Sequence, residues 1–234
     1  MPAQPIRALI FDLDGTLVDS ESQTAQAIAA VAARHGVADF SLPIVETHGR
    51  TWEDVARRIK ELTVLGIPER KLVSELLEAW NKLTLYALPV PGATEALRLA
   101  AQAGLRLSVV SSSPHAVIDA FVERLGVADL IVPQARIGGD DVSRGKPHPE
   151  GFLRAAQRLD ATPATSLVFE DSRAGLTAAR AAGMRSIYVT CCAGIDAANL
   201  ALATANCTDY RALPRTFWQQ LLSGHVDLDG RSFA

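Results

Sequence analysis

Residues 6–16 read IRALIFDLDGT, and this stretch indicates the architecture of the whole chain. The first six of these residues are apolar except for Arg7, and they lead directly into Asp12. A short aliphatic run that stops at acidic residues and a glycine is typical of a strand buried in a parallel sheet. We therefore predict a buried strand over residues 6–11, with an acidic turn at its carboxyl end.

Three further apolar runs share these features: residues 105–110, 167–169 and 187–189. Helical stretches over residues 95–103 and 174–182 stop at Gly104 and Gly183, and glycine is the preferred residue just past a helix because it accepts positive φ. Repeated alternation of helix and strand predicts an α/β fold, a Rossmann-like parallel sheet with helices on both faces.

The interval from residue 20 to residue 88 departs from this alternation. It reads as helices over residues 21–34, 52–62 and 69–86, and we expect no strand between residues 19 and 89. Pro89, Pro91 and Gly92 then mark the return to the alternating pattern. We predict an α/β core formed by residues 1–19 and 89–234, with an inserted all-helical cap domain over residues 20–88.

Composition excludes several classes of protein. The 23 basic and 26 acidic residues give a net charge of −3, which provides no field for binding nucleic acid. No apolar run approaches the ~18 residues of a membrane span, and residues 1–7 lack the features of a signal peptide. The three cysteines, Cys191, Cys192 and Cys207, cannot all pair within one chain, so we expect a reduced, cytoplasmic location. A metal site at Cys191 and Cys192 is disfavoured because no third ligand lies at a usual spacing.

Side chains that could take part in catalysis or ligand binding occur where the predicted strands end or in the loops beside them. They are Asp12 and Asp14, Ser111, Lys146, and Glu170 with Asp171. Each has an ordinary explanation when it is taken alone. The acids could be solvated turn or helix-terminal residues, Ser111 a helix cap and Lys146 a surface lysine. Ligands of parallel sheets bind beyond the carboxyl ends of the strands, however, and all four groups fall there in one chain.

The sequence contains its own control for the first acidic pair. Residues 227–230, DLDG, repeat four residues of the first motif. They follow Ser223, Gly224 and His225 rather than a strand, so we interpret this copy as a turn without a role in ligand binding.

Together these residues resemble the haloacid dehalogenase-like hydrolase superfamily. The resemblance covers about 220 residues and includes Asp12-Leu-Asp14-Gly-Thr16, Ser111 after an apolar strand, Lys146 before a proline, and Glu170-Asp171-Ser172 with Gly175. A helical insertion between the first two motifs is similar to the subgroup of small-metabolite phosphatases and β-phosphoglucomutases.

The resemblance implies a Mg²⁺-dependent phosphatase that acts through an aspartyl phosphate. Asp12 would be the nucleophile, and Asp14 would protonate the leaving oxygen and later activate water. Asp12, the main-chain carbonyl of Asp14 and Asp171 would hold Mg²⁺, which prefers oxygen ligands, and Glu170 would be a further or an outer ligand. Ser111 and Lys146 would bind the phosphoryl oxygens.

The residues at three further positions help to choose between the reactions known in this superfamily. Dehalogenating and phosphonate-cleaving relatives usually lack a second aspartate, so Asp14 favours phosphoryl transfer. Mutases of the family carry a histidine and an arginine in the cap that fall on Thr24 and Trp52 by an ungapped count, so we favour a phosphatase of a small sugar or polyol phosphate. A mutase and a catalytically silent metabolite-binding module remain the alternatives.

Residues of the cap give weaker indications. The segment His48-Gly49-Arg50 lies between two predicted helices, where relatives present a substrate-specificity loop. Arg50 could therefore bind substrate oxygens, or it could be a solvated loop residue. Trp80 and Tyr86 are expected in the core of the cap, and Trp218 in the core of the last helix. Oligomeric state does not follow from the sequence, because no heptad pattern stands out.

Overall fold

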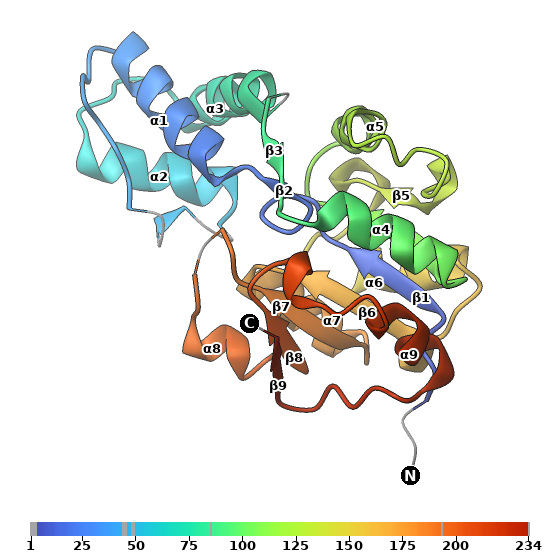
Figure 1. Ribbon diagram of the computed structural model, residues 1–234. Coiled ribbons are helices and arrows are strands. Elements are labelled where there is room, and N and C mark those ends of the chain that lie inside the picture. The colour runs from blue at the N-terminus through green and yellow to red at the C-terminus, as the bar shows by residue number, and fades with distance from the viewer. Residues whose placement is uncertain (1–3, 44–45, 48–49, 85, 193, 234) are drawn as a thin grey trace. The chain divides into compact units, whose positions relative to one another are not determined.

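The computed structural model describes residues 4–43, 46–47, 50–84, 86–192 and 194–233 of the chain (Figure 1). Contacts divide the chain into two compact units. The first comprises Met1–Val18 and Pro89–Ala234, and the second comprises Asp19–Leu88.

The first unit is built on a parallel sheet with the order β5-β4-β1-β6-β7-β8-β9. Its strands, as far as the chain is described, are β1 (Ala8–Phe11), β4 (Arg106–Val110), β5 (Arg136–Ile137), β6 (Ser166–Glu170), β7 (Arg185–Val189), β8 (Ala205–Cys207) and β9 (Arg231–Phe233). β1 lies between β4 and β6, with Ile10 opposite Ser108 on one side and Val168 on the other. All four residues of β1 are buried, as the apolar run predicts.

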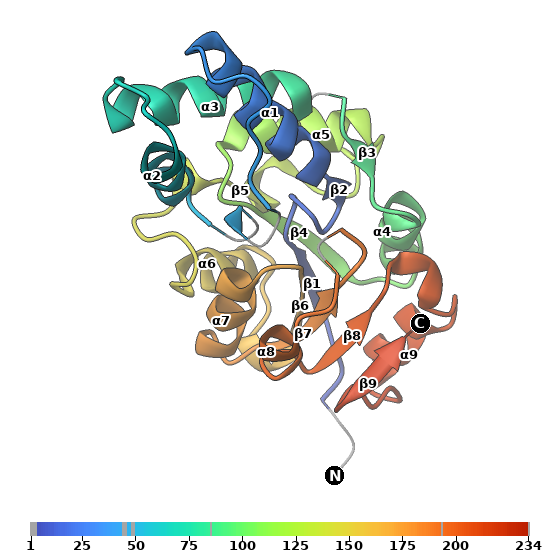
Figure 2. The same ribbon diagram turned by 90° about the vertical axis from the view of Figure 1, so that its left-hand side faces the viewer.

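Helices cover both faces of this sheet, which confirms the predicted fold class. α6 (Glu150–Arg158) and α7 (Arg173–Ala181) pack on one face, where their alanines meet Ile10 and Val168 (Figure 2). α4 (Ala93–Gln102) and α9 (Phe217–Ser223) lie on the opposite face. There Phe11 stacks on Phe169 with ring centroids 4.8 Å apart, and the Trp218 ring lies 6.1 Å from that of Phe169. Trp218 is thus a core residue, as predicted. The other α-helices among the described residues of this unit are α5 (His115–Arg124) and α8 (Ala197–Leu200).

The described residues of the second unit form α1 (Glu21–Arg34), α2 (Trp52–Leu62) and α3 (Glu69–Thr84), which share an apolar core. Trp80 belongs to this core. It donates from Nε1 to Thr24 Oγ1 at 3.1 Å and packs edge-on against Trp52 with centroids 6.0 Å apart. Tyr86, by contrast, is 80% exposed, so the expectation that it lies in the core is wrong.

The observed secondary structure differs from the sequence expectations in three respects. The helix expected to reach residue 86 ends at Thr84, because Tyr86 N and Ala87 N donate to carbonyls three residues back and tighten the chain into a turn. β2 (Val18–Asp19) and β3 (Leu88–Pro89) pair where we expected only linkers. β5, β8 and β9 were not predicted, because each has only two or three residues.

The second DLDG segment forms a turn, as expected. Asp229 N donates to Asp227 Oδ1 at 3.1 Å, and the turn leads into β9. Because β9 runs parallel to the other strands, a turn that precedes it lies at the amino edge of the sheet. Asp12 follows β1 and therefore lies at the opposite edge. No helix in the described ranges has the length and apolar character to cross a bilayer.

Candidate active site

Asp12 begins the turn at the carboxyl end of β1. Its side chain is buried, and its main-chain N–H donates to the carbonyl of Phe169 on β6 at 3.0 Å. The turn depends on Gly15, whose φ is +80°. A Cβ added to Gly15 would lie 1.7 Å from Asp171 Oδ2, so only glycine lets the turn approach that carboxylate.

Three buried carboxylates meet at this edge of the sheet. Each of Asp12, Glu170 and Asp171 offers an oxygen within 4.8 Å of the other two. Within the part of the chain that the structure describes, this is the one cluster of three or more potential metal-ligating side chains. Glu170 is the last residue of β6 and Asp171 follows it, and Thr16 Oγ1 donates to Asp171 Oδ1 at 3.3 Å.

Lys146 supplies the positive charge at this cluster. Its Nζ donates to Asp12 Oδ1 and, at 2.7 Å, to Glu170 Oε2. The ammonium group also lies 5.2 Å from the centroid of the Phe152 ring. Burial lowers the pKa of Lys146, but the charges of Asp12 and Glu170 outweigh burial, so the pKa of Lys146 lies above its ordinary value. Lys146 is therefore a permanent cation in the site.

The carboxylates outnumber that cation. Burial, reinforced by the charge of Glu170, raises the pKa of Asp12 above its ordinary value of 3.8, although Lys146 acts in the opposite direction. A divalent cation that prefers oxygen ligands would relieve this excess of negative charge. The donor set and the close approach at Gly15 therefore fit a metal such as Mg²⁺.

Two serines after β4 orient Asp14. Ser111 Oγ and Ser113 Oγ donate to Asp14 Oδ2 at 3.2 Å and 3.0 Å, and Ser113 N donates to Ser111 Oγ at 3.0 Å. The structure thus brings Ser111 to the predicted site, with its hydroxyl on Asp14. Sequence reasoning missed Ser113. The signal was the serine run 111–113, in which the residues two apart lie on one side of an extended chain.

Glu170 is held on both of its oxygens. Oε2 accepts from Lys146, while Oε1 accepts from Ser172 N at 3.1 Å and from Ser172 Oγ at 2.7 Å. Ser172 also caps α7 by accepting from Gly175 N at 3.1 Å. A Cβ on Gly175 would lie 2.0 Å from the Glu170 carboxyl carbon. The start of α7 is therefore shaped around this carboxylate.

Arg50 lies in the second unit, whereas the three carboxylates lie in the first unit. Its side chain is exposed, and its main-chain N–H donates to the Thr47 carbonyl at 3.1 Å. His48 and Gly49, which complete the predicted loop motif, lie outside the described residues. A substrate-binding role for Arg50 stays a prediction.

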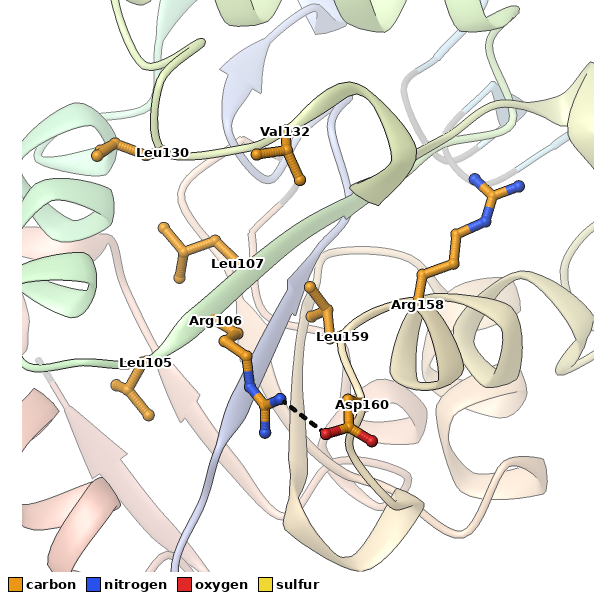
Figure 3. A pocket seen from close by; sticks show the side chains of 8 residues that line it. All are labelled: Leu105, Arg106, Leu107, Leu130, Val132, Arg158, Leu159 and Asp160. Carbon is orange, nitrogen blue, oxygen red and sulfur yellow. Dashed lines mark ion pairs between the residues drawn. The ribbon is translucent and has the colours of Figure 1, made fainter.

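A separate cavity of about 370 Å³ lies at the amino end of β4 (Figure 3). Leu105, Leu107 and Leu159 contribute to its walls, and Arg106 pairs with Asp160 there at 3.6 Å. The cavity is at the sheet edge opposite Asp12, and none of the carboxylates of the cluster lines it. The candidate active site is the cluster and not this cavity.

Comparison with known proteins identifies the family that this fold and site define. The family model of haloacid dehalogenase-like hydrolases matches residues 6–183. The chain belongs to this family of hydrolases, which confirms the predicted family and enzyme class.

Individual relatives agree with this assignment. The chain is 34% identical over 185 residues to validoxylamine A 7'-phosphate phosphatase of Streptomyces hygroscopicus subsp. limoneus, a match that covers 79% of this chain and 85% of the relative. It is 31% identical over 202 residues to the phosphorylated carbohydrates phosphatase of Thermotoga maritima, with coverages of 78% and 84%. A haloacid dehalogenase family hydrolase from Deinococcus radiodurans, solved with bound phosphate and sodium, aligns with a TM-score of 0.75 at 27% identity, with coverages of 94% and 98%.

Proposed function

We propose that the chain is a Mg²⁺-dependent phosphatase that hydrolyses small phosphorylated metabolites, of which sugar or polyol phosphates are the favoured class. The observation that carries this proposal is the placement of Asp12. A buried carboxylate beside Lys146 and two further carboxylates suits attack on a phosphoryl group whose charge must be neutralised. Relatives named as a validoxylamine A 7'-phosphate phosphatase and as a phosphorylated carbohydrates phosphatase support the proposal of a phosphatase.

We assign to the residues the roles that the family resemblance implies. Asp12 attacks phosphorus and forms an aspartyl phosphate, while Lys146 and the hydroxyl of Ser111 bind phosphoryl oxygens. Asp14 gives a proton to the leaving oxygen and then takes one from the water that hydrolyses the intermediate. Asp12, the main-chain carbonyl of Asp14 and Asp171 would hold Mg²⁺, which would neutralise negative charge during phosphoryl transfer.

Glu170 and Ser172 position the reacting groups and do not react themselves. Glu170 holds the Lys146 ammonium group, and Ser172 holds Glu170, so the cation stays oriented while the charge on the phosphoryl group changes. A preorganised cation of this kind need not rearrange during the reaction.

Two positions of the second unit support the proposal of a phosphatase rather than a mutase. Thr24 and Trp52, where related mutases carry a histidine and an arginine by our count, both contact Trp80 in the helical core. Neither side chain has the charge needed to hold a sugar phosphate. A silent binding module is disfavoured because all the acids of the site are present.

The decisive experiment measures phosphate release from p-nitrophenyl phosphate with and without Mg²⁺, followed by a panel of phosphorylated sugars, polyols, glycolate and nucleotides ranked by kcat/KM. We expect metal-dependent release, and we expect Asp12→Asn to retain no more than a few per cent of it with an unchanged circular dichroism spectrum. Absence of metal-dependent release would favour the binding module. Isomerisation of a sugar phosphate without release of phosphate would establish the mutase.

We further propose that Arg50 binds oxygens of the leaving group. Arg50→Ala should lower kcat/KM for the preferred metabolite by roughly tenfold, about 1.4 kcal/mol, while hydrolysis of p-nitrophenyl phosphate stays unchanged. An equal loss for both substrates would show that Arg50 acts on the phosphoryl group or on folding. No loss for either substrate would leave it a solvated loop residue.

A further inference from the structure

Two adjacent cysteines follow β7 at the same sheet edge as the carboxylates. Cys191 Sγ and Cys192 Sγ lie 3.1 Å apart, and both residues are partly exposed. A disulfide bond is roughly 1 Å shorter than this separation. The two sulfur atoms are therefore already directed at each other, and only a small movement separates them from bonding distance.

The turn that carries these cysteines is fixed at both ends. Gly194 N donates to the Thr190 carbonyl at 2.9 Å, and the Tyr188 hydroxyl donates to the Gly194 carbonyl at 2.8 Å. Thr190 N is itself tied to the Cys207 carbonyl on β8 at 3.0 Å. These hydrogen bonds anchor the residues on either side of the cysteines to β7 and β8.

The third cysteine differs from this pair. Cys207 is fully buried in β8, and burial, followed by the charge of Cys191, raises its pKa to about 12. A thiol reacts as its thiolate and only where reagents can reach it. Cys207 is therefore the unreactive thiol of the three, whereas the partly exposed pair is accessible.

We propose that Cys191 and Cys192 are a redox-modification site, which low-molecular-weight disulfides such as glutathione disulfide oxidise reversibly to a vicinal disulfide. In the first step, one cysteine thiolate attacks glutathione disulfide, forms a mixed disulfide and releases one glutathione thiolate. The neighbouring thiolate then attacks the protein sulfur of that mixed disulfide and releases the second glutathione. Two protein thiols are oxidised, one glutathione disulfide is reduced, and the two protons pass to the released glutathione. This chemistry uses none of the residues assigned to phosphate hydrolysis.

The test is intact mass spectrometry of the folded full chain after incubation with glutathione disulfide. We expect a loss of about 2 Da, since one S–S bond replaces two S–H bonds, without a retained glutathione, and we expect dithiothreitol to reverse it. An unchanged mass, or stable glutathione adducts on the wild-type chain, would overturn the proposal.

Cysteine variants identify which two cysteines form the disulfide. Peptide mapping with trypsin cannot do so, because no lysine or arginine separates the three cysteines between Arg185 and Arg211. Cys207→Ser should lose about 2 Da as the wild type does, whereas Cys192→Ser should keep one glutathione instead. If Cys207→Ser abolishes the loss, Cys207 is one of the partners, and if Cys192→Ser retains the loss, the disulfide joins Cys191 to Cys207. Either result rejects the vicinal pair.

Discussion

Two serine hydroxyls bind the side chain of Asp14, whereas Lys146 binds Asp12 and Glu170. Two serine hydroxyls donate to Oδ2, which suits a group that exchanges a proton with the leaving oxygen. We expect Asp14→Asn to lower kcat by about 10²–10⁴ for alkyl phosphates, the usual range for general acid–base catalysis. The loss should be much smaller for p-nitrophenyl phosphate, whose leaving group needs little protonation.

The chain provides a matched control for this substitution. Asp229 occupies the same position in the second DLDG segment, is exposed, and lies at the opposite edge of the sheet. Asp229→Asn should leave both substrates unaffected. Equal losses for good and poor leaving groups in Asp14→Asn would mean that Asp14 is not the acid.

Ser113 is expected to position Asp14. Ser113→Ala removes one hydrogen bond to a carboxylate and should lower kcat for alkyl phosphates by about tenfold, or about 1.4 kcal/mol. Ser112→Ala is the control, because Ser112 is exposed between the two serines that contact Asp14. Parallel rate measurements on the two variants test this role, and equal kcat values for Ser113→Ala and wild type would contradict it.

The start of α7 is the element most closely fitted to the site. Alanine normally stabilises a helix relative to glycine by up to about 1 kcal/mol. At Gly175, however, the added Cβ would collide with the Glu170 carboxyl group at 2.0 Å. We expect Gly175→Ala to lower the free energy of unfolding by at least about 1 kcal/mol and to reduce kcat, because Glu170 orients Lys146.

Urea unfolding measures the first effect, with Gly66→Ala as the control. A Cβ added to Gly66 would meet no atom within 4 Å, and the φ of Gly66 lies outside the left-handed region, so its replacement should change stability by no more than about 0.5 kcal/mol. A Gly175→Ala variant more stable than the wild type would show that the Glu170 carboxylate moves aside freely.

Strand length explains which elements the sequence predicts. β1, β4, β6 and β7 were recognisable because each has four or five residues, of which most are apolar and nearly all are buried. β5, β8 and β9 lie toward the two sides of the sheet, and residues such as Arg136, Asn206 and Arg231 interrupt their apolar character. Their pairing is imposed by the neighbouring strand, so no local pattern indicates it.

Within the site, too, the sequence indicates some features and not others. Residue type and placement at strand ends indicated Asp12, Asp14, Ser111 and Lys146 before any contact was known. The sequence could not show that the Ser111 hydroxyl binds Asp14, that Ser113 joins it, or that Ser172 connects Glu170 to a helix cap. These are contacts between residues brought together by folding, and their spacing along the chain does not indicate which atoms meet.

At the scale of the whole molecule, the excess of buried negative charge links stability to pH and metal. Burial and the charge of Glu170 raise the pKa of Asp12, so the folded chain binds a proton there more tightly than the unfolded chain does. Without metal, this contribution to stability is complete below the ordinary pKa of 3.8 and is lost as pH rises through the raised pKa of the folded state.

The stability that a bound metal adds has the opposite pH dependence: it increases as pH rises, because the metal binds ionised carboxylates. The increase in Tm on replacing a chelator with Mg²⁺ should therefore grow from about pH 5 to about pH 8. Differential scanning calorimetry at several pH values measures this increase, and Asp171→Asn should abolish most of it. An increase that is independent of pH would contradict the link to these carboxylates.

Leu17 accepts a hydrogen bond from Val90 at 2.9 Å, so the chain leaves the first unit and returns to it at one point. The sheet therefore needs nothing from the intervening residues to bring β1 beside β4. In evolutionary terms, the length and surface of Asp19–Leu88 could change without altering the strand order or the carboxylates of the first unit. Exchange of this segment by recombination at the junction would leave the carboxylate cluster in place, because its three residues all lie in the first unit.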